Sequence, residues 1–193
     1  MTRPVRLLVL DCEDSFVHTL ARYAREHGAE TRVVRADAVT VEQVAADRPD
    51  GIVISPGPGR PAGAGIAVAL VRALPQTPIL GVCLGHQAIC EAYGGATTIS
   101  PEPMHGRASA VSHDGSALYA GLPSPFRAAR YHSLLGRPGA PLVETAWSGP
   151  LVMGVRHADR PHHGVQFHPE SLLTEGGHRL VGNFVAMCGS EDT

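Results

Sequence analysis

The segment TPILGVCLGHQAI, Thr77–Ile89, is the most informative part of the sequence for the fold. Its apolar run ends at Cys83, and a glycine lies two residues before the cysteine and another two residues after it, at Gly81 and Gly85. A buried structural cysteine does not need both glycines. A nucleophile on a tight turn between a strand and a helix does, because only small neighbours fit around such a turn. The stretch therefore predicts a strand, a sharp turn that carries Cys83, and a helix.

Such a turn has chemical consequences for the cysteine and for the residue that follows it. It lifts the side chain of Cys83 above the sheet and places it near a helix N-terminus, which favours thiolate over thiol. The backbone N–H of Leu84 then faces the oxyanion of a tetrahedral intermediate. Taken alone, the GVCLG pattern leaves a nucleophile and a structural cysteine equally open.

The first half of the chain repeats the alternation of strand and helix. We expect Asp14 to cap the first helix and Gly28 to end it. The expected strands are 5–11, 30–35, 51–55 and 78–83, and the expected helices are 14–28, 40–47, 66–74 and 84–94. This alternation predicts an α/β fold whose parallel sheet is covered by helices on both faces.

After Gly95 the pattern changes to short strands joined by turns. We expect them to extend the sheet in antiparallel fashion or to form a small subsheet. The expected strands are 107–113, 126–133, 141–148, 151–157 and 163–169, and a closing helix is expected at 175–188. Neither an internal repeat nor a long linker divides the 193 residues, so a single domain over residues 1–193 is expected.

Composition excludes several classes of function. The formal net charge is −2, which gives no electrostatic reason to bind nucleic acid or an anionic membrane. All 16 basic residues are arginine, so a lysine Schiff base and a phosphate loop ending in Gly-Lys are excluded. No apolar run reaches the length of a membrane span, and the N-terminus reads as a first strand, so we expect a cytoplasmic protein.

The other cysteines and the histidine-rich segment have plainer interpretations. No two cysteines have CxxC spacing, so we expect free thiols and neither a zinc site nor a redox pair. Cys12 lacks a turn bracketed by glycines, and we do not expect it to be a nucleophile. The histidine-rich stretch with His157, His162, His163 and His168 could suggest a metal site. Its ADRPHHG segment, however, is a Pro/Gly turn without typical ligand spacing, which favours a solvated loop.

Two further motifs could complete a catalytic site. In GVQFHPES, His168 and Glu170 are two residues apart, so in an extended segment both side chains point the same way. Glu170 could fix the imidazole tautomer while His168 moves a proton. For an HxE pattern taken alone, however, a solvated His and Glu at a strand end is the favoured interpretation. SPGPG, Ser55–Gly59, could expose N–H groups at the end of a parallel strand, or be an ordinary turn.

Taken together, the motifs point to a known family. The chain resembles the class I, or triad-type, glutamine amidotransferases, nearly from end to end. The resemblance is carried by DCEDSF, SPGPG, GVCLGHQAICEAYGG, MHGRAS, HDGSALYAGLPSPFRAARYHSL and GVQFHPESLLTEGG. SPGPG, HGRAS and ARYHSL resemble in particular the glutaminase subunits that serve chorismate-using synthases. The resemblance implies a single α/β domain with a mostly parallel, mixed sheet flanked by helices and a flavodoxin-like core.

The resemblance also implies a role for each matching residue. Cys83 matches the nucleophile, His168 the base, and Glu170 the acid that orients the base. Gln87 matches a side chain that binds the substrate glutamine. The backbone segments implied to bind glutamine are Gly57, Pro58 and Gly59, which complete the oxyanion hole, and Ser133 and Leu134, which hold the α-amino and α-carboxylate groups.

The implied reaction is hydrolysis of L-glutamine, with ammonia passed to a chorismate-binding synthase subunit. Anthranilate synthase is the expected synthase, and 4-amino-4-deoxychorismate and 2-amino-2-deoxyisochorismate synthases remain alternatives. No cofactor or metal is expected in this chain, whereas Mg²⁺ is expected in the partner. We expect the partner to contact MHGRAS and ARYHSL through Arg107, Arg130 and His132. Two rival readings are a stand-alone cysteine hydrolase and a non-catalytic regulatory module.

Overall fold

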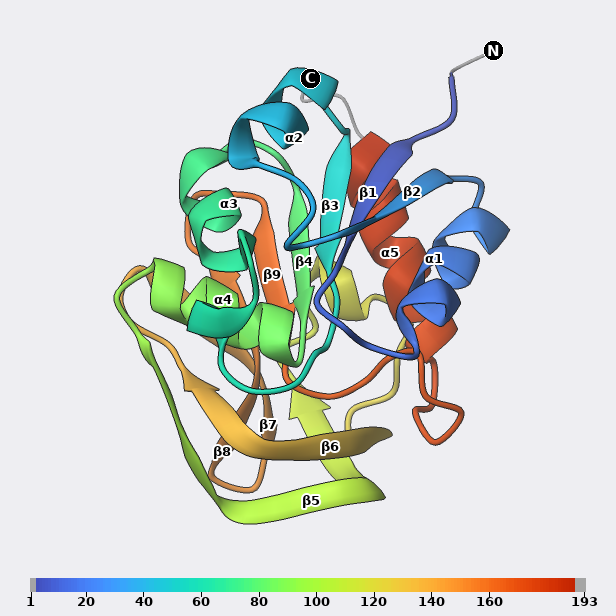
Figure 1. Cartoon of the computed structure of the whole chain (residues 1–193). Coiled ribbons are helices and arrows are strands. Elements are labelled where there is room, and N and C mark those ends of the chain that lie inside the picture. Colours follow the sequence, from blue (N-terminus) through green and yellow to red (C-terminus); the bar gives the residue numbers. More distant parts are fainter. Residues whose placement is uncertain (1–2, 190–193) are drawn as a thin grey trace.

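The computed structural model describes residues 3–189, and the nine strands of this range form a single sheet. Its strands are β1 (Arg6–Asp11), β2 (Glu30–Arg35), β3 (Gly51–Ile54), β4 (Ile79–Val82), β5 (Ala96–His113), β6 (Phe126–Arg137), β7 (Leu142–Ser148), β8 (Leu151–His157) and β9 (His162–Val165). Its helices are α1 (Val17–Glu26), α2 (Val41–Asp47), α3 (Ala67–Ala73), α4 (Leu84–Ala92) and α5 (Gly177–Gly189), with 3₁₀ turns at Pro61–Gly63 and Ala117–Tyr119. Figure 1 labels these elements on the ribbon.

The strand order is β2-β1-β3-β4-β9-β8-β7-β5-β6. Neighbouring strands from β2 to β9 pair in parallel, and those from β9 to β6 pair in antiparallel fashion. The predicted α/β fold with a mostly parallel core and an antiparallel extension is therefore confirmed.

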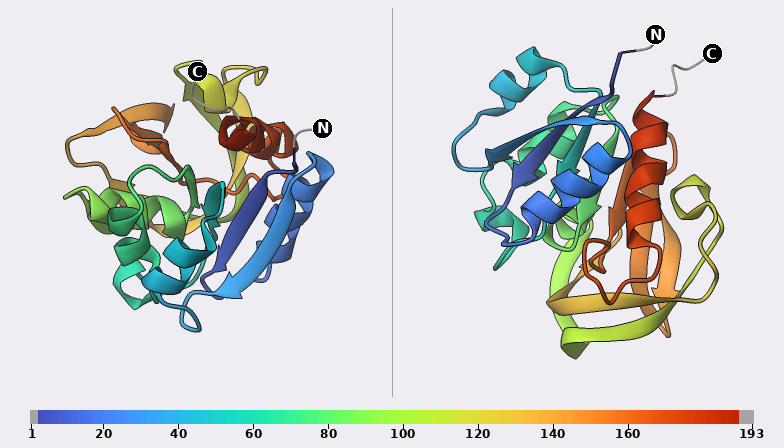
Figure 2. Two further views of the ribbon diagram at one scale, coloured as in Figure 1. Left: turned by 90° about the horizontal axis from the view of Figure 1, so that it is seen from above. Right: turned by 90° about the vertical axis from the view of Figure 1, so that its right-hand side faces the viewer.

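Helices cover both faces of the parallel strands, and Figure 2 shows them on opposite sides of the sheet. Leu7 and Val9 of β1 belong to the apolar cluster that includes residues of α1 and α5. Leu8 and Leu10 belong to the cluster that includes residues of α3 and α4. Burial on both faces explains why these strands are continuously apolar instead of alternating. Each fully buried leucine stabilises the fold by roughly 1.5–3 kcal/mol.

The start of α1 differs from the prediction. The helix begins at Val17, and Phe16 occupies its N-cap position without a side-chain cap. The carboxylate of Asp14 instead accepts a hydrogen bond from the N–H of Phe16 at 3.0 Å. Asp14 therefore closes the turn that precedes the helix. The predicted stop is confirmed, because Gly28 follows the helix with φ of +86°.

Strand β9 also differs from the prediction. We expected 163–169 to belong to the antiparallel part, but β9 pairs in parallel with β4, with Gly81 opposite Gly164. The strand ends at Val165, and residues 166–171 form bends and turns. The last strand of the chain is thus inserted next to β4, the strand that leads to Cys83.

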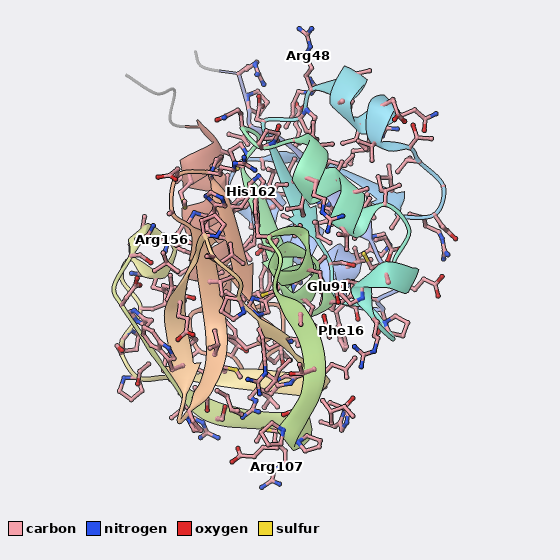
Figure 3. All side chains as sticks on the ribbon, turned by 90° about the vertical axis from the view of Figure 1, so that its left-hand side faces the viewer. Phe16, Arg48, Glu91, Arg107, Arg156 and His162 are labelled. Atoms are coloured by element: carbon pink, nitrogen blue, oxygen red, sulfur yellow. The ribbon has the colours of Figure 1, made fainter. Side chains whose placement is uncertain are left out.

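The longest strands, β5 and β6, form a ribbon that extends beyond the parallel core (Figure 1). Irregularities in register occur between Ile99 and Met104 and between His105 and Arg107. Arg107 is exposed, and Figure 3 shows it at the far end of this ribbon. The ribbon carries Ser133 and Leu134 on β6 toward the end of the sheet where Cys83 lies.

The histidine-rich segment is buried, which corrects the prediction of a solvated loop. His157, His162 and His163 are all at most 8% exposed. His162 Nδ1 lies 2.7 Å from the Tyr93 hydroxyl, and its Nε2 lies 3.1 Å from the carbonyl oxygen of Leu74. These contacts tie β9 to the ends of α3 and α4.

In residues 3–189, no group of three or more His, Cys, Asp or Glu side chains could hold a metal ion. None of the helices within residues 3–189 combines the length and the apolar composition that a membrane-spanning helix requires.

Candidate active site

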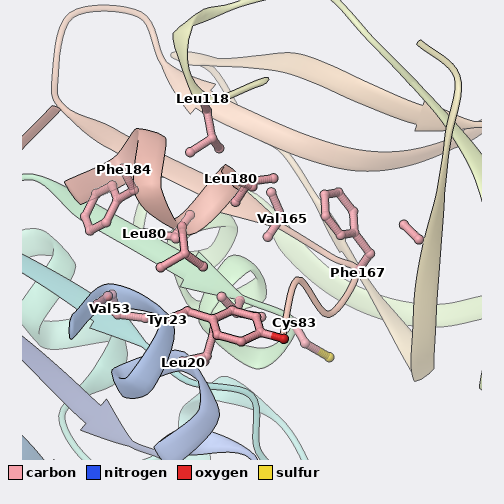
Figure 4. Close-up of a cluster of buried hydrophobic side chains, with 14 of the residues drawn as sticks. Leu20, Tyr23, Val53, Leu80, Cys83, Leu118, Val165, Phe167, Leu180 and Phe184 are labelled. Atoms are coloured by element: carbon pink, nitrogen blue, oxygen red, sulfur yellow. The ribbon is translucent and has the colours of Figure 1, made fainter. Parts of the chain in front are cut away.

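Cys83 occupies a strained turn between β4 and α4. Its φ of 51° and ψ of −98° are unusual for a residue other than glycine. The turn is held on both sides, because the Cys83 N–H donates to Val165 O at 2.8 Å and the Gln87 N–H donates to Cys83 O at 3.1 Å. In Figure 4 the cysteine lies at the edge of a buried apolar cluster, with its sulfur directed away from that cluster. The predicted strand, turn and helix are confirmed.

The two glycines that bracket Cys83 are required by close backbone approach. A Cβ atom on Gly81 would collide with the backbone of Gly85, and a Cβ atom on Gly85 would collide with Ile54 O of β3. In both cases the nearest colliding atom belongs to the backbone, not to a flexible side chain, so the clash could be removed only by moving the strand or the helix. The sequence signal at Gly81 and Gly85 is therefore a packing requirement of the turn that positions Cys83.

Gly85→Ala should lower the free energy of unfolding by about 1–3 kcal/mol, because the added methyl group overpacks the contact between α4 and β3. Urea denaturation followed by circular dichroism measures the change. Gly63→Ala is the matched control, since a Cβ there meets nothing within 4 Å. Equal stability of the two variants would contradict the packing requirement.

His168 and Glu170 are in direct contact beside the turn. His168 Nδ1 lies 2.6 Å from Glu170 Oε1, and both residues are buried. The segment that carries them is anchored by Thr174, whose hydroxyl donates to His168 O at 2.6 Å and accepts from Ala129 N at 2.9 Å. The pairing of the two side chains is as predicted, although a turn and not an extended strand brings it about.

The environment of His168 favours its protonated form. Burial by itself disfavours the imidazolium, but the neighbouring Cys83 and Glu170 outweigh burial and raise the pKa of His168 above its ordinary value. Its Nε2 atom is buried and has no hydrogen-bond partner among residues 3–189. Glu170 therefore holds one ring nitrogen, and the other is left for proton transfer with a nearby group.

One cavity of about 210 Å³ gathers most of the predicted binding residues. Cys83 and Gln87 line it from α4 and its preceding turn, and Ser133 and Leu134 line it from β6. The remaining lining residues are Gly57, Pro58, Gly59, His105, Tyr131 and His132. Leu84, the first residue of α4, has a backbone N–H in the first turn, where helices leave such groups unpaired. Segments far apart in sequence thus meet around Cys83.

The glycine-proline loop is fixed against the end of β1. A Cβ on Gly57 would collide with the backbone of Cys12, so only glycine allows this approach. Ser55 Oγ accepts from the Cys12 N–H at 2.9 Å and donates to Pro56 O at 2.7 Å. Cys12 therefore supports the loop through its backbone. Burial also raises the pKa of its thiol, to about 12, which disfavours a thiolate there.

Gln166 was not singled out from the sequence, although it lies within GVQFHPES. Its Nε2 atom lies 3.6 Å from Cys83 Sγ, and its Oε1 atom accepts from Gly136 N at 2.9 Å. Gln166 could have been identified only by knowing that it follows β9 and that β9 lies beside β4. Local sequence pattern does not reveal that strand pairing.

Two of the residues expected to contact a partner are buried. Arg130 is 1% exposed and His132 is 3% exposed. Arg130 Nε donates to His132 Nε2 at 3.0 Å, and Arg130 Nη2 donates to Glu102 O at 3.3 Å. Burial therefore contradicts the expectation that the side chains of Arg130 and His132 are offered to a partner at the rim of the Cys83 pocket, although His132 does line that cavity. Arg107 is exposed, as that expectation requires.

Comparisons with known proteins agree with this architecture. The family model described as "Glutamine amidotransferase class-I" matches residues 8–188. Anthranilate synthase component 2 of Thermus thermophilus is 52% identical in an alignment 188 residues long, which covers 94% of this chain and 92% of that protein. Aminodeoxychorismate synthase component 2 of Escherichia coli is 45% identical in an alignment 184 residues long, which covers 93% of this chain and 98% of that protein.

The fold has a solved counterpart as well. A crystal structure of a putative GMP synthase protein from Thermoplasma acidophilum matches with a TM-score of 0.86 at 27% identity, covering 97% of this chain and 96% of that chain. The family model spans nearly all of the described residues, including the Cys83 turn, the cavity and the His168–Glu170 pair. The chain therefore belongs to the class I glutamine amidotransferase family.

Proposed function

We propose that this chain is the glutamine-hydrolysing subunit of an anthranilate synthase, in which Cys83, His168 and Glu170 are the catalytic residues. Two observations carry the proposal. Cys83, Gln87, Ser133 and Leu134 line one cavity. The buried His168–Glu170 pair lies against that cavity, because the ring centroids of His168 and the lining residue Tyr131 are 5.0 Å apart. A nucleophile, a base and an acid that orients the base are the parts that amide hydrolysis through a thioester needs.

In the first half of the reaction, Cys83 Sγ attacks the side-chain amide carbon of glutamine. The N–H groups of Leu84 and of the Gly57 loop stabilise the oxyanion that forms. Protonated His168 gives its Nε2 proton to the leaving nitrogen, and ammonia departs. A γ-glutamyl thioester on Cys83 remains.

In the second half, water attacks the thioester carbon while neutral His168 accepts a proton from it. The C–S bond breaks, glutamate leaves and the thiolate is restored. Glu170 holds His168 Nδ1 through both halves, so that Nε2 always faces the reacting atoms. Gln87 and the backbone at Ser133 and Leu134 bind the amino-acid end of glutamine. The chain's own residues supply each of these steps, and we propose no cofactor in it.

The proposed partner is a chorismate-binding synthase subunit, which uses the released ammonia. Relatives at 46–52% identity are named anthranilate synthase component 2, which favours that synthase over the aminodeoxychorismate enzyme. Exposed apolar side chains next to the cavity offer this partner a surface. Leu172 is 95% exposed, and it follows Ser171, whose hydroxyl lies 3.4 Å from that of the cavity residue Tyr131.

The isolated chain should hydrolyse glutamine slowly, and adding the synthase partner with chorismate should accelerate it. The physical reason is that partner binding orders Ser133 and Leu134 at the cavity rim, so that more of the bound glutamine is correctly placed for attack by Cys83. Steady-state glutaminase kinetics, with and without the anthranilate-forming partner, measure the effect.

The same assay separates the possible partners. The aminodeoxychorismate-forming partner is the comparison, and identification of the aromatic product names the synthase. Leu172→Asp should weaken activation by the partner without changing the slow rate of the isolated chain. Full activity of the isolated chain, unaffected by either partner, would favour a stand-alone hydrolase instead.

A further inference from the structure

The side-chain amide of Gln166 contacts the sulfur of Cys83. Its Nε2 atom lies 3.6 Å from Cys83 Sγ, within the range of a hydrogen bond to sulfur, and Gln166 is fully buried. An amide donor in a dry environment interacts more strongly with a thiolate than with a thiol, because the thiolate carries the full negative charge.

The orientation of this amide is determined by its neighbours. Gln166 Oε1 accepts from the backbone N–H of Gly136 at 2.9 Å, and a backbone N–H can only donate. The oxygen must therefore face β6, which leaves Nε2 facing Cys83. Gln87 adds to this, because its Nε2 donates to Leu134 O at 3.2 Å and lies 3.5 Å from Gln166 Oε1.

Backbone contacts hold Gln166 and Cys83 at a constant separation. The Gln166 N–H donates to Met153 O of β8 at 2.9 Å, and the Cys83 N–H donates to Val165 O of β9 at 2.8 Å. The nucleophile and the amide thus lie directly after the ends of two adjacent parallel strands, β4 and β9, in which Val82 and Val165 are paired. Because these contacts exist before substrate binds, the donor is already in place.

We propose that Gln166 stabilises the thiolate of Cys83 and fixes the direction of its sulfur. This inference rests on the proposed nucleophilic role of Cys83. Gln166 complements His168, because His168 exchanges a proton whereas the amide of Gln166 donates a hydrogen bond at every pH used. Removing Gln166 should therefore reduce the thiolate fraction at neutral pH and loosen the angle of attack.

Two substitutions isolate this contribution. Gln166→Met keeps the side-chain length and removes the donor to sulfur and the acceptor for Gly136. Gln166→Glu keeps an oxygen for the Gly136 N–H and places a negative charge beside the sulfur. Asn183→Leu is the matched control, because Asn183 donates to Leu118 O at 3.0 Å and Ala120 O at 2.9 Å on η2 (Ala117–Tyr119) and the turn after it. It should lower the melting temperature only.

The test is the rate of alkylation of Cys83 by iodoacetamide as a function of pH, with the labelled cysteine located by peptide mass spectrometry. A hydrogen bond to a charged group corresponds to a shift of about one to two pH units. We expect the midpoint of the profile to rise by that amount in Gln166→Met and by more in Gln166→Glu. We expect kcat for glutamine to fall about tenfold or more, with a smaller change in KM.

The possible outcomes separate the two proposals. If Cys83 of the unchanged protein is alkylated but the profiles of both Gln166 variants match it, the role of Gln166 is wrong and the nucleophile stands. If Cys83 is not the cysteine that reacts, the proposed function fails and this inference fails with it. Should Gln166→Met not fold, Gln166→Glu still decides, because it keeps the contact with Gly136.

Discussion

Cys83→Ala should abolish glutamine hydrolysis and the glutamine-dependent amination of chorismate by the complex. The loss should be about three orders of magnitude or more, because a thioester needs a thiol and none of the other described residues that line the cavity is a cysteine. Amination with added ammonium should remain, since ammonia can enter from solution. Glutaminase turnover and product formation from each nitrogen source, measured on the same complex, check both halves of this expectation.

Cys12→Ser is the matched control for this substitution. Cys12 is also buried, but it supports the Gly57 loop through its backbone N–H, which serine retains. Its variant should keep nearly all glutaminase activity. A loss equal to that of Cys83→Ala would transfer the nucleophile to the loop at Cys12, and more than trace activity in Cys83→Ala would refute its assignment.

His168→Ala should reduce kcat for glutamine by about 10²–10⁴-fold, because the proton for the leaving nitrogen then comes from water. Glu170→Ala should reduce kcat by a smaller factor, about tenfold or more. The imidazole remains in this variant but loses the carboxylate that lies 2.6 Å from its Nδ1 atom. Steady-state kinetics of the complex at saturating glutamine give both values.

The control for His168→Ala is His162→Ala, a buried histidine at the opposite end of β9. Its loss should lower stability through the contacts with Tyr93 and Leu74 while kcat of the folded fraction is kept. Small and equal losses in His168→Ala and Glu170→Ala would mean that the pair is structural.

Local sequence was sufficient for most of the elements in the first half of the chain. The period of apolar residues and the turn residues predicted β1 to β4 and the helices between them, because each depends on contacts within a short segment. Helix α2 is an example, since Thr40 and Gln43 form a capping box within its first turn. The Cys83 turn could also be predicted, because the backbone packs so closely at Gly81 and Gly85 that a residue with a Cβ atom does not fit there.

Where local signals compete with tertiary contacts, the sequence was less informative. Asp14 is of a residue type that commonly caps helices, yet it closes the turn before α1. The sequence around His157, His162 and His163 is typical of a solvated loop, yet these histidines are buried by β9 and its neighbours. Burial of a polar side chain depends on partners such as Tyr93 and Leu74, whose proximity is decided only by how strands and helices pack.

Local sequence pattern was enough to predict the strand–turn–helix at Cys83 and the α/β class, and the family resemblance identified His168 and Glu170. Long-range strand pairing was needed to place β9 in parallel beside β4, which brings those two residues and Gln166 next to Cys83. Such pairing joins segments separated by a long stretch of chain, and its stability comes from burial and ladder hydrogen bonds that no short window contains. The contact between Gln166 and Cys83 follows from that pairing, and local sequence pattern alone does not reveal it.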